Sequence, residues 1–220
     1  TVGIALMCRA DQPLHSYKGP PLDARIWDFA QPQAPLRSGF VLGVAGMLSP
    51  RKSPVSYAWG VPGIGLAHKR RVREQFGRDI QLFGIAEHIP NRDNRISLSD
   101  RVDKQGVPRV RLYSDYHAED LRTMRAMKTR ILEWADACDL QDRTRLYSSY
   151  DQPAAAHVAG TCRMGDDPER SVTDAIGRVH GMKNLFISDA SILPTLGAGD
   201  PPSLTIQALA LHIADNIARG

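Results

Sequence analysis

The sequence predicts an α+β fold, in which a mostly antiparallel sheet with flanking helices precedes a more irregular C-terminal segment. Two patterns support this prediction. Residues 95–112 alternate apolar and polar side chains around a central turn, and residues 116–138 repeat apolar side chains every three or four positions. After Tyr150 the chain changes character, because loops rich in Gly, Asp and Pro follow one another. We therefore divide the chain into a sheet-and-helix unit at 1–150 and a second unit at 151–220.

Most strands are expected in the first half of the chain. Residues 1–65 are rich in Pro and Gly and contain short apolar runs, which is typical of strands joined by long connections. The predicted strands lie at 39–46, at 80–89, where the strand is expected to be buried, and at 95–98 and 107–112, an antiparallel pair joined by a turn at 103–106.

Two helices are predicted before Tyr150. The basic run at 68–74 lies on a helix that ends near Gly77, and it forms either a solvated face or a docking patch for an acidic partner or electron acceptor. Ser114 and Asp115 can cap a second helix from about 116 to 138. Its apolar positions share one stripe and are expected to pack in the core: Leu121, Met124, Met127, Ile131, Trp134 and Cys138.

The composition excludes several classes of protein. The net charge of +4, with 28 Lys and Arg against 24 Asp and Glu, is too balanced for a nucleic-acid-binding module. Three cysteines without a close pair predict neither a disulfide framework nor a zinc site, and we expect no metal. No apolar run approaches the ~20 residues of a membrane span, and no signal-peptide pattern opens the chain. We expect a reducing compartment, the cytoplasm.

The last predicted helix, at 204–218, differs from the others because it is apolar nearly all round. Such a helix is expected to be buried, together with its N-terminus. The amides of the first helical turn have no partner within the helix, so side chains, water or a ligand must satisfy them. Gly197 and Gly199 in the preceding loop allow another group to approach closely. Two interpretations stay open, namely a helix capped by Ser203 and a ligand site.

Three motifs of the C-terminal unit occur in a fixed order. Residues 157–165 read His-Val-Ala-Gly-Thr-Cys-Arg-Met-Gly, residues 179–194 contain Asp-Ala-Ser after an apolar run, and residues 202–210 read Pro-Ser-Leu-Thr-Ile-Gln-Ala-Leu-Ala. In order, spacing and residue types the motifs resemble the C-terminal signature of the glucose-methanol-choline (GMC) oxidoreductases. Residues 80–150 are compatible with the substrate domain of that family. The resemblance implies that the C-terminal unit completes an FAD-binding α/β domain.

The resemblance also implies a reaction. Enzymes of this family transfer a hydride from a carbinol carbon to N5 of FAD, while a histidine that matches His157 removes the hydroxyl proton. An imidazole suits that step because it can accept a proton near neutral pH. The donor is expected to be an alcohol, with a sugar or polyol favoured. Both an oxidase and a dehydrogenase stay open, because the sequence does not identify the electron acceptor.

The resemblance places cofactor contacts at two positions along the chain. Asp189 and Ala190 match a turn that contacts the ribityl or pyrophosphate oxygens of FAD, and residues 185–188 are expected to form the buried strand before it. An Asx turn or a helix cap is the alternative role of Asp189.

The second position is the loop that enters the last helix. Gly199, Asp200 and Pro201 match the loop beside the pyrimidine edge of the flavin ring. Ser203 and Leu204 begin the helix, whose dipole would stabilise negative charge on that edge.

Asp200 departs from the family pattern, which usually has His or Asn as the second active-site residue. An ionised carboxylate beside His157 would favour the imidazolium and would oppose an anionic reduced flavin. Asp200 is therefore protonated, turned away, or a mark of altered or lost activity. We predict that His157 and Asp200 form the catalytic pair, and a plain turn role for Asp200 is the alternative.

The Gly-rich turn that holds the FAD pyrophosphate in this family is missing from the sequence. Residues 60–65 contain glycines, but Pro62 and the lack of a following acidic strand end make them a poor substitute. We expect an N-terminal FAD-binding fragment or subunit as the partner, and we do not expect the chain alone to bind FAD tightly. The alternative function is a non-catalytic subunit or remnant of the family that serves as a binding or structural partner.

Overall fold

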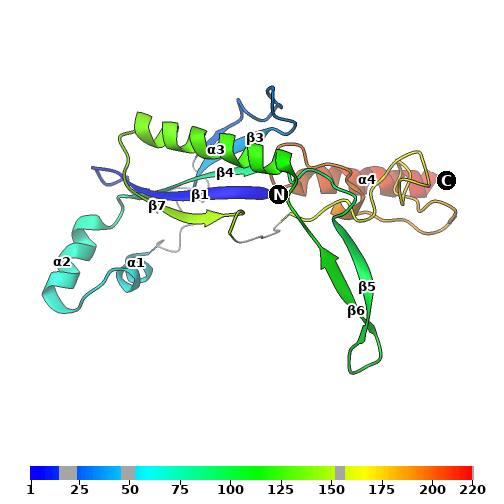
Figure 1. The fold of residues 1–220 in the computed structure, drawn as a ribbon, viewed down its shortest axis with the longest axis horizontal. Helices are drawn as coiled ribbons and strands as arrows, with labels where there is room; N and C mark the ends of the chain where they lie inside the picture. Colours follow the sequence, from blue (N-terminus) through cyan, green and yellow to red (C-terminus); the bar gives the residue numbers. More distant parts are fainter. Residues whose placement is uncertain (15–23, 46–52, 152–156, 220) are drawn as a thin grey trace.

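A five-stranded antiparallel sheet with one long helix across it forms the body of the molecule (Figure 1). The computed structural model describes residues 1–14, 24–45, 53–151 and 157–219. The strand order is β2-β3-β4-β1-β7, so the first strand of the chain lies inside the sheet. The strands are β1 (Val2–Arg9), β2 (Ala24–Ile26), β3 (Phe40–Ala45), β4 (Asp79–Ala86) and β7 (Gln141–Ser148). The predicted mixture of helices with antiparallel strands is confirmed.

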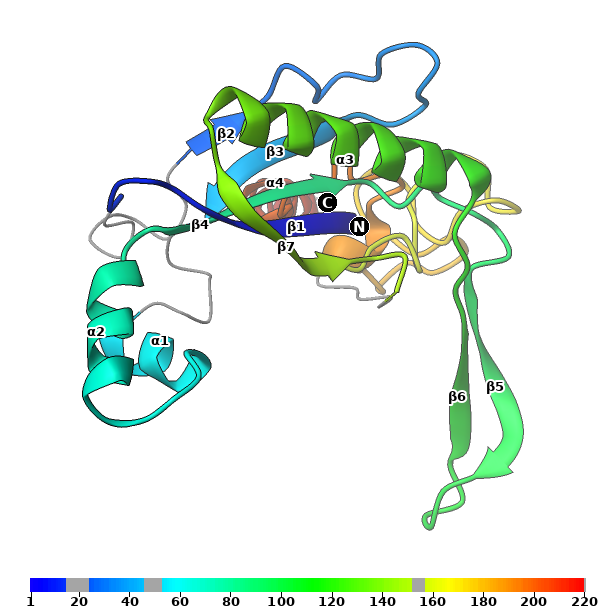
Figure 2. The ribbon, with the colours of Figure 1, turned by 60° about the vertical axis from the view of Figure 1, so that its left-hand side comes forward.

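Helix α3 (Ala118–Ala137) covers one face of the sheet (Figure 2). Met124, Met127 and Ile131 of the predicted stripe are at most 1% exposed and pack on the sheet. A Cβ atom on Gly84 of β4 would lie 2.4 Å from Cγ of Met127, so the absence of a side chain there makes room for the methionine. The stripe is confirmed except at its end, where Cys138 is exposed.

The start of α3 lies later than predicted. His117, not Ser114 or Asp115, is the N-cap, and its imidazole accepts a hydrogen bond from the Glu119 amide. The carboxylate of Asp120, which is fully buried, accepts from the amides of His117 (2.7 Å) and of Ile89 (2.8 Å). The Asp120 carboxylate therefore accepts hydrogen bonds from one amide at the helix start and from one amide just after β4. These bonds fix where the first turn of α3 begins.

Two arms extend from the body (Figure 2). The predicted antiparallel pair is the hairpin β5 (Arg95–Val102) and β6 (Pro108–Tyr113), which is paired Ile96 to Leu112. Helices α1 (Pro54–Gly60) and α2 (Gly65–Gln75) form the other arm. The basic run lies on α2, which has no buried residue, in agreement with a solvated face.

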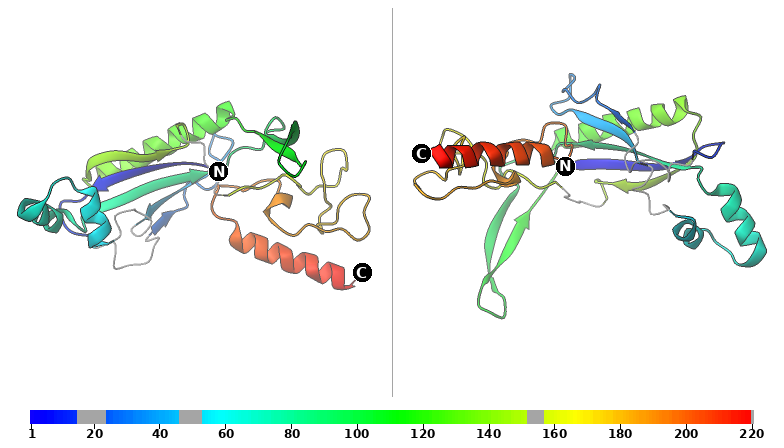
Figure 3. Two further views of the ribbon diagram at one scale, coloured as in Figure 1. Left: turned by 90° about the horizontal axis from the view of Figure 1, so that it is seen from below. Right: turned by 180° about the vertical axis from the view of Figure 1, so that it is seen from behind.

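The C-terminal segment lies beside one end of the sheet and is mostly irregular up to α4 (Ser203–Arg219) (Figure 3). The buried strand predicted at 185–188 is wrong. Phe186 makes a single bridge to Arg178, and Leu185 is 47% exposed, because the described chain pairs this stretch with the short irregular segment at 177–179 and not with a strand of the sheet.

The prediction that α4 is buried is also wrong for the described chain. Ile213 is its only buried residue, whereas Leu204, Leu211 and Ile217 are exposed. The views from below and behind show one side of the helix facing the C-terminal segment and the other side uncovered (Figure 3). None of the described helices is both long enough and apolar enough to cross a bilayer.

Candidate active site

The loop that enters α4 is fixed to the end of β4 by Glu87. This side chain is 8% exposed, and its Oε1 accepts hydrogen bonds from Oγ1 of Thr195 (2.5 Å) and from the amide of Leu196 (2.8 Å). A carboxylate that is buried without hydrogen-bond donors loses its hydration and strongly destabilises the folded state, so Glu87 needs these two donors. The sheet therefore determines where the loop at 195–202 lies.

Gly199 brings the same loop into backbone contact with β4. Its φ is +80°, and a Cβ atom there would lie 2.2 Å from the carbonyl carbon of Ala86. Only glycine combines this dihedral with so close an approach. The close approach expected from the glycines of the loop occurs, but the observed neighbour is the sheet itself.

Asp200 turns toward the sheet. Its Oδ1 lies 3.1 Å from Nη1 of Arg25 on β2, and the two side chains are 30% and 17% exposed. In the parts of the chain that the structure describes, no hydrogen bond or ion pair joins Asp200 to His157. Of the alternatives for Asp200, this geometry favours a carboxylate turned away from the imidazole.

His157 begins the motif that runs beside the turn at 189–192. The amides of Cys162 and Met164 donate to the carbonyls of Ser191 (2.9 Å) and Ile192 (2.8 Å), so the two motifs are held together by backbone bonds. The imidazole is half-buried, and its Nδ1 is buried without a hydrogen-bond partner among the described residues. A buried nitrogen without a partner is destabilising, and a bound group or an ordered water that reached it would remove that cost.

Asp189 caps the short 3-10 helix η2 (Ala190–Ile192), which is the role held open as the alternative. Its Oδ1 accepts from the amide of Ser191 at 2.7 Å. Hydrogen bonds from the Ser191 side chain and amide hold the pKa of Asp189 below its usual value. The carbonyl of Ala190 accepts from the Gly160 amide (3.4 Å), so the cap also stabilises the contact with the His157 motif.

The first turn of α4 is open. Pro201, Ser203 and Leu204 are exposed, and the helical ladder begins with the Ile206 amide donating to the carbonyl of Pro202 (2.9 Å). No hydrogen bond in the described chain reaches the amides of Ser203 and Leu204. Ser203 is itself the first residue of α4, and no bond of its hydroxyl caps the helix among the described residues. Unpaired amides at a helix N-terminus favour negative charge or a polar ring edge.

These features test whether FAD fits the residues present. The open α4 start and the unpartnered Nδ1 of His157 fit the polar edge of a flavin ring and a substrate hydroxyl. The described residues offer no Gly-rich turn between a strand and a helix for the pyrophosphate. They also contain no cluster of three potential metal ligands. The chain thus fits one part of the cofactor.

Three contributors to this arrangement are not predicted from the sequence. Arg25 lies on a three-residue strand at the sheet edge, and no motif marks it. Glu87 carried a usable signal, since a carboxylate directly after a buried strand needs a partner. Thr195 belongs to a turn-rich loop, where a threonine has many possible roles.

A cavity of about 380 Å³ between α3 and the loop at 29–38 contains none of the site residues.

Comparison with known proteins identifies the family of this chain. The sequence model of the family described as GMC oxidoreductase matches residues 90–210. This chain belongs to the GMC oxidoreductase family.

Two relatives illustrate the range of the family. The chain is 41% identical over 165 residues to 6'''-hydroxyparomomycin C oxidase of Streptomyces lividus, a match that covers 72% of this chain and 29% of that protein. It is 35% identical over 156 residues to 2-methyl-1,2-propanediol dehydrogenase of Mycolicibacterium austroafricanum, which covers 70% of this chain and 28% of the relative. The chain thus spans less than a third of the length of these relatives.

A solved structure shares the fold. Pyridoxine 4-oxidase from Mesorbium loti superposes with a TM-score of 0.56 at 21% identity, and the match covers 99% of this chain and 42% of that one. The likeness concerns the fold alone at this level of identity. It extends over the sheet, both arms and the C-terminal segment.

Proposed function

We propose that this chain is the C-terminal part of an FAD-dependent oxidoreductase that oxidises an alcohol, with a sugar or polyol CH–OH group as the favoured donor. The observation that carries the proposal is the half-buried imidazole of His157, whose Nδ1 is unpartnered among the described residues, within a motif bonded to the turn at 189–192. The names of three relatives support the donor class: 6'''-hydroxyparomomycin C oxidase, 2-methyl-1,2-propanediol dehydrogenase and the paromamine 6'-oxidase of Streptomyces fradiae.

FAD supplies the hydride acceptor when it is bound. In this proposal Asp189 and Ala190 contact its ribityl or pyrophosphate oxygens, and Gly199 and Pro201 lie beside its ring. Ser203 and Leu204 present the open first turn of α4, where the helix dipole stabilises negative charge.

His157 takes the proton of the substrate hydroxyl in this mechanism. Removal of that proton raises the electron density on the carbinol carbon, which makes loss of a hydride from that carbon easier. Asp200, the second predicted member of the pair, acts through its position in the loop, since its carboxylate faces Arg25. The Asp200 carboxylate is then paired with Arg25 and not with the imidazole of His157.

The remaining part of the enzyme is an N-terminal FAD-binding fragment or subunit. We place the substrate-binding unit at 1–150 and the closing part of the FAD-binding unit at 151–220. Leu204 and Leu211, which are seven residues apart and share one side of α4, leave that side uncovered, and contact with the FAD-binding part would bury it. The missing Gly-rich turn would belong to that part as well.

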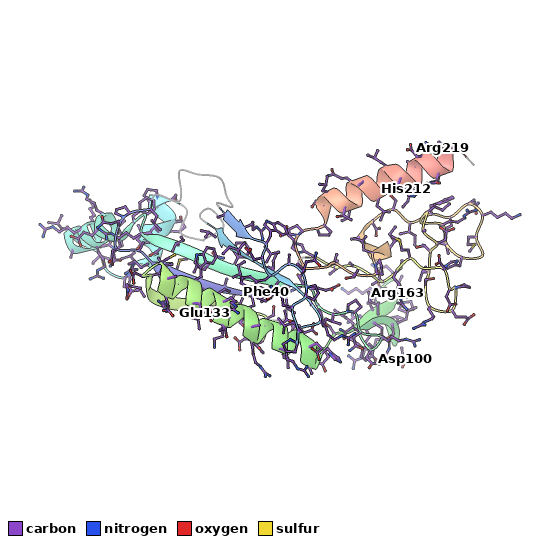
Figure 4. The ribbon with its side chains drawn as sticks, turned by 90° about the horizontal axis from the view of Figure 1, so that it is seen from above. Phe40, Asp100, Glu133, Arg163, His212 and Arg219 are labelled. Carbon is purple, nitrogen blue, oxygen red and sulfur yellow. The ribbon has the colours of Figure 1, made fainter. Side chains whose placement is uncertain are left out.

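Replacement of His157 tests the proposal in the assembled, flavin-loaded protein. The variant His157→Ala is expected to reduce the flavin about a hundredfold more slowly with an alcohol donor, because the general base is lost. The exposed His212 on α4 gives the matched control, and His212→Ala should keep the rate within about twofold. Figure 4 shows His212 on α4. Equal rates for both variants would remove the role of general base from His157.

A further inference from the structure

Asp200 and Arg25 form an ion pair that links the loop before α4 to the edge of the sheet. The joined atoms, Oδ1 and Nη1, are 3.1 Å apart and are both fully shielded from solvent. Neither atom makes an aligned hydrogen bond within the described chain. Each charge is therefore compensated mainly by the other, and a shielded pair is screened by salt much less than a surface pair.

The sheet is shaped to hold Arg25 in this position. Arg25, Gly43 and Phe83 face one another across β2, β3 and β4. The guanidinium carbon of Arg25 lies 4.9 Å from the centre of the Phe83 ring, a cation–π contact. A Cβ atom on Gly43 would lie 2.5 Å from Cζ of Phe83 and 3.1 Å from Cδ of Arg25. The missing side chain at position 43 thus lets the arginine lie flat across the sheet.

This row of residues lies on the face of the sheet opposite α3. Leu42 packs in the core beneath α3, and side chains alternate along a strand, so position 43 belongs to the other face. Asp200 reaches that face from the loop that carries Gly199 and Pro201. The arginine therefore connects this face of the sheet with the loop assigned to the flavin ring in the proposed function.

We propose that Arg25 is a positioning residue of this oxidoreductase, which fixes the loop before α4 by neutralising Asp200. The inference rests on the proposed function for its effect on the rate. Loss of the guanidinium leaves a shielded Asp200 carboxylate without its partner, which disfavours the present conformation of the loop. The loop would also lose one of its attachments to the sheet, and displacements of about 1 Å can lower a rate about a hundredfold.

The pair is tested by a double-mutant cycle in the assembled, flavin-loaded protein. The variants are Arg25→Met, Asp200→Asn and their combination, with Arg25→Lys as a milder change that keeps the charge. Arg101, an exposed arginine of β5, provides the matched control Arg101→Met. Each variant is measured for kcat and KM with an alcohol donor, and for amide hydrogen exchange of residues 195–202.

The expected result is coupling. Arg25→Met should lower kcat about tenfold to a hundredfold, with KM changed less than about threefold, and should speed amide exchange in the loop. Adding Asp200→Asn to Arg25→Met should recover most of kcat, because no unpaired charge remains. Arg101→Met should leave both measurements unchanged.

Other outcomes separate this inference from the proposed function. Additive effects of the two substitutions, or an unchanged kcat and loop exchange in Arg25→Met, would overturn the positioning role even if His157→Ala is slow. If His157→Ala has no effect, the base is wrong, and the exchange data alone still decide whether Arg25 fixes the loop.

Discussion

The body of the sheet and the C-terminal helix bury their apolar side chains to very different extents. Helix α3 places Met124, Met127 and Ile131 at 1% exposure or less against the sheet. Helix α4 has a similar supply of apolar residues, yet Leu204 and Leu211 are 79% and 71% exposed. The difference lies in the partners, because the sheet that covers the α3 stripe belongs to the same chain.

The two regions differ in whether their packing partners belong to the described chain. The α3 stripe and the strands it packs on are complete within the described residues, so the body forms a closed core. The C-terminal segment is held to the body mainly by polar contacts, from Glu87 and Arg25 to the loop at 195–200. In the proposed enzyme, the FAD-binding part supplies the missing apolar contacts of α4.

Replacing a core methionine should produce the largest loss of stability. Met127→Ala removes a fully buried side chain that fills the space above Gly84, and we expect a loss of about 2–5 kcal/mol in the free energy of unfolding. Urea unfolding of the variant and the parent measures the difference. A loss below about 1 kcal/mol would mean that the body core is not closed in the way described.

Cys8 and Cys138 extend the comparison of buried and exposed regions to the reactivity of their thiols. Burial raises the pKa of the Cys8 thiol from its ordinary 9.0 to about 11, whereas Cys138 is exposed. At pH 8 the thiolate fraction of Cys8 is then about a hundredfold lower than that of an unperturbed thiol, and iodoacetamide should modify Cys138 at least that much faster.

The same shift predicts a dependence on pH. Cys8 keeps its proton in the folded state up to about pH 11, whereas the unfolded thiol loses it near 9.0. The folded state binds more protons between these values, so stability should fall as the pH rises from 9 to 11. Cys8→Ala should remove this part of the pH dependence, and an unchanged slope in the variant would contradict the assignment to Cys8.

Glu87 joins the two regions, and its loss should have an intermediate effect. Glu87→Ala leaves the Leu196 amide and the Thr195 hydroxyl without an acceptor, which we expect to cost about 1–3 kcal/mol. Hydrogen exchange should show faster opening of residues 195–202 and little change in α3. Equal acceleration in both places would show that the loop and the body open as a unit.

The smallest effect is expected on the uncovered side of α4. Leu211→Ser should change the stability of this chain by no more than about 0.5 kcal/mol, because the side chain is exposed. In the assembled protein the same change should cost about 1.5–3 kcal/mol if the FAD-binding part buries it. Equal effects in the two forms would contradict that contact, and Ile213→Ser, a buried change, serves as the positive control.

The sequence predicted the elements whose patterns depend on contacts within the chain. The alternation at 95–112 and the stripe on α3 gave the hairpin and the long helix, since their periodicity follows from local geometry. The start of α3 was misplaced because the carboxylate of Asp120 bonds to Ile89, 31 residues away. Such a long-range bond leaves no local pattern.

The candidate site was predicted in its motifs and not in its supports. The resemblance pointed to His157, Asp189 and the loop at 199–204, and their roles stay predictions. The strand at 185–188 failed because a short apolar run does not reveal whether a neighbouring strand is present. Arg25 escaped notice because its role depends on Gly43 and Phe83 in other strands.

The central claim is tested most directly by the visible absorbance spectrum of the assembled protein, recorded without oxygen before and after addition of sugars and alcohols. We expect a flavin absorbance band that bleaches with at least one donor, and that bleaches far more slowly in His157→Ala. A preparation without a flavin band, or a band that no alcohol bleaches, would contradict it.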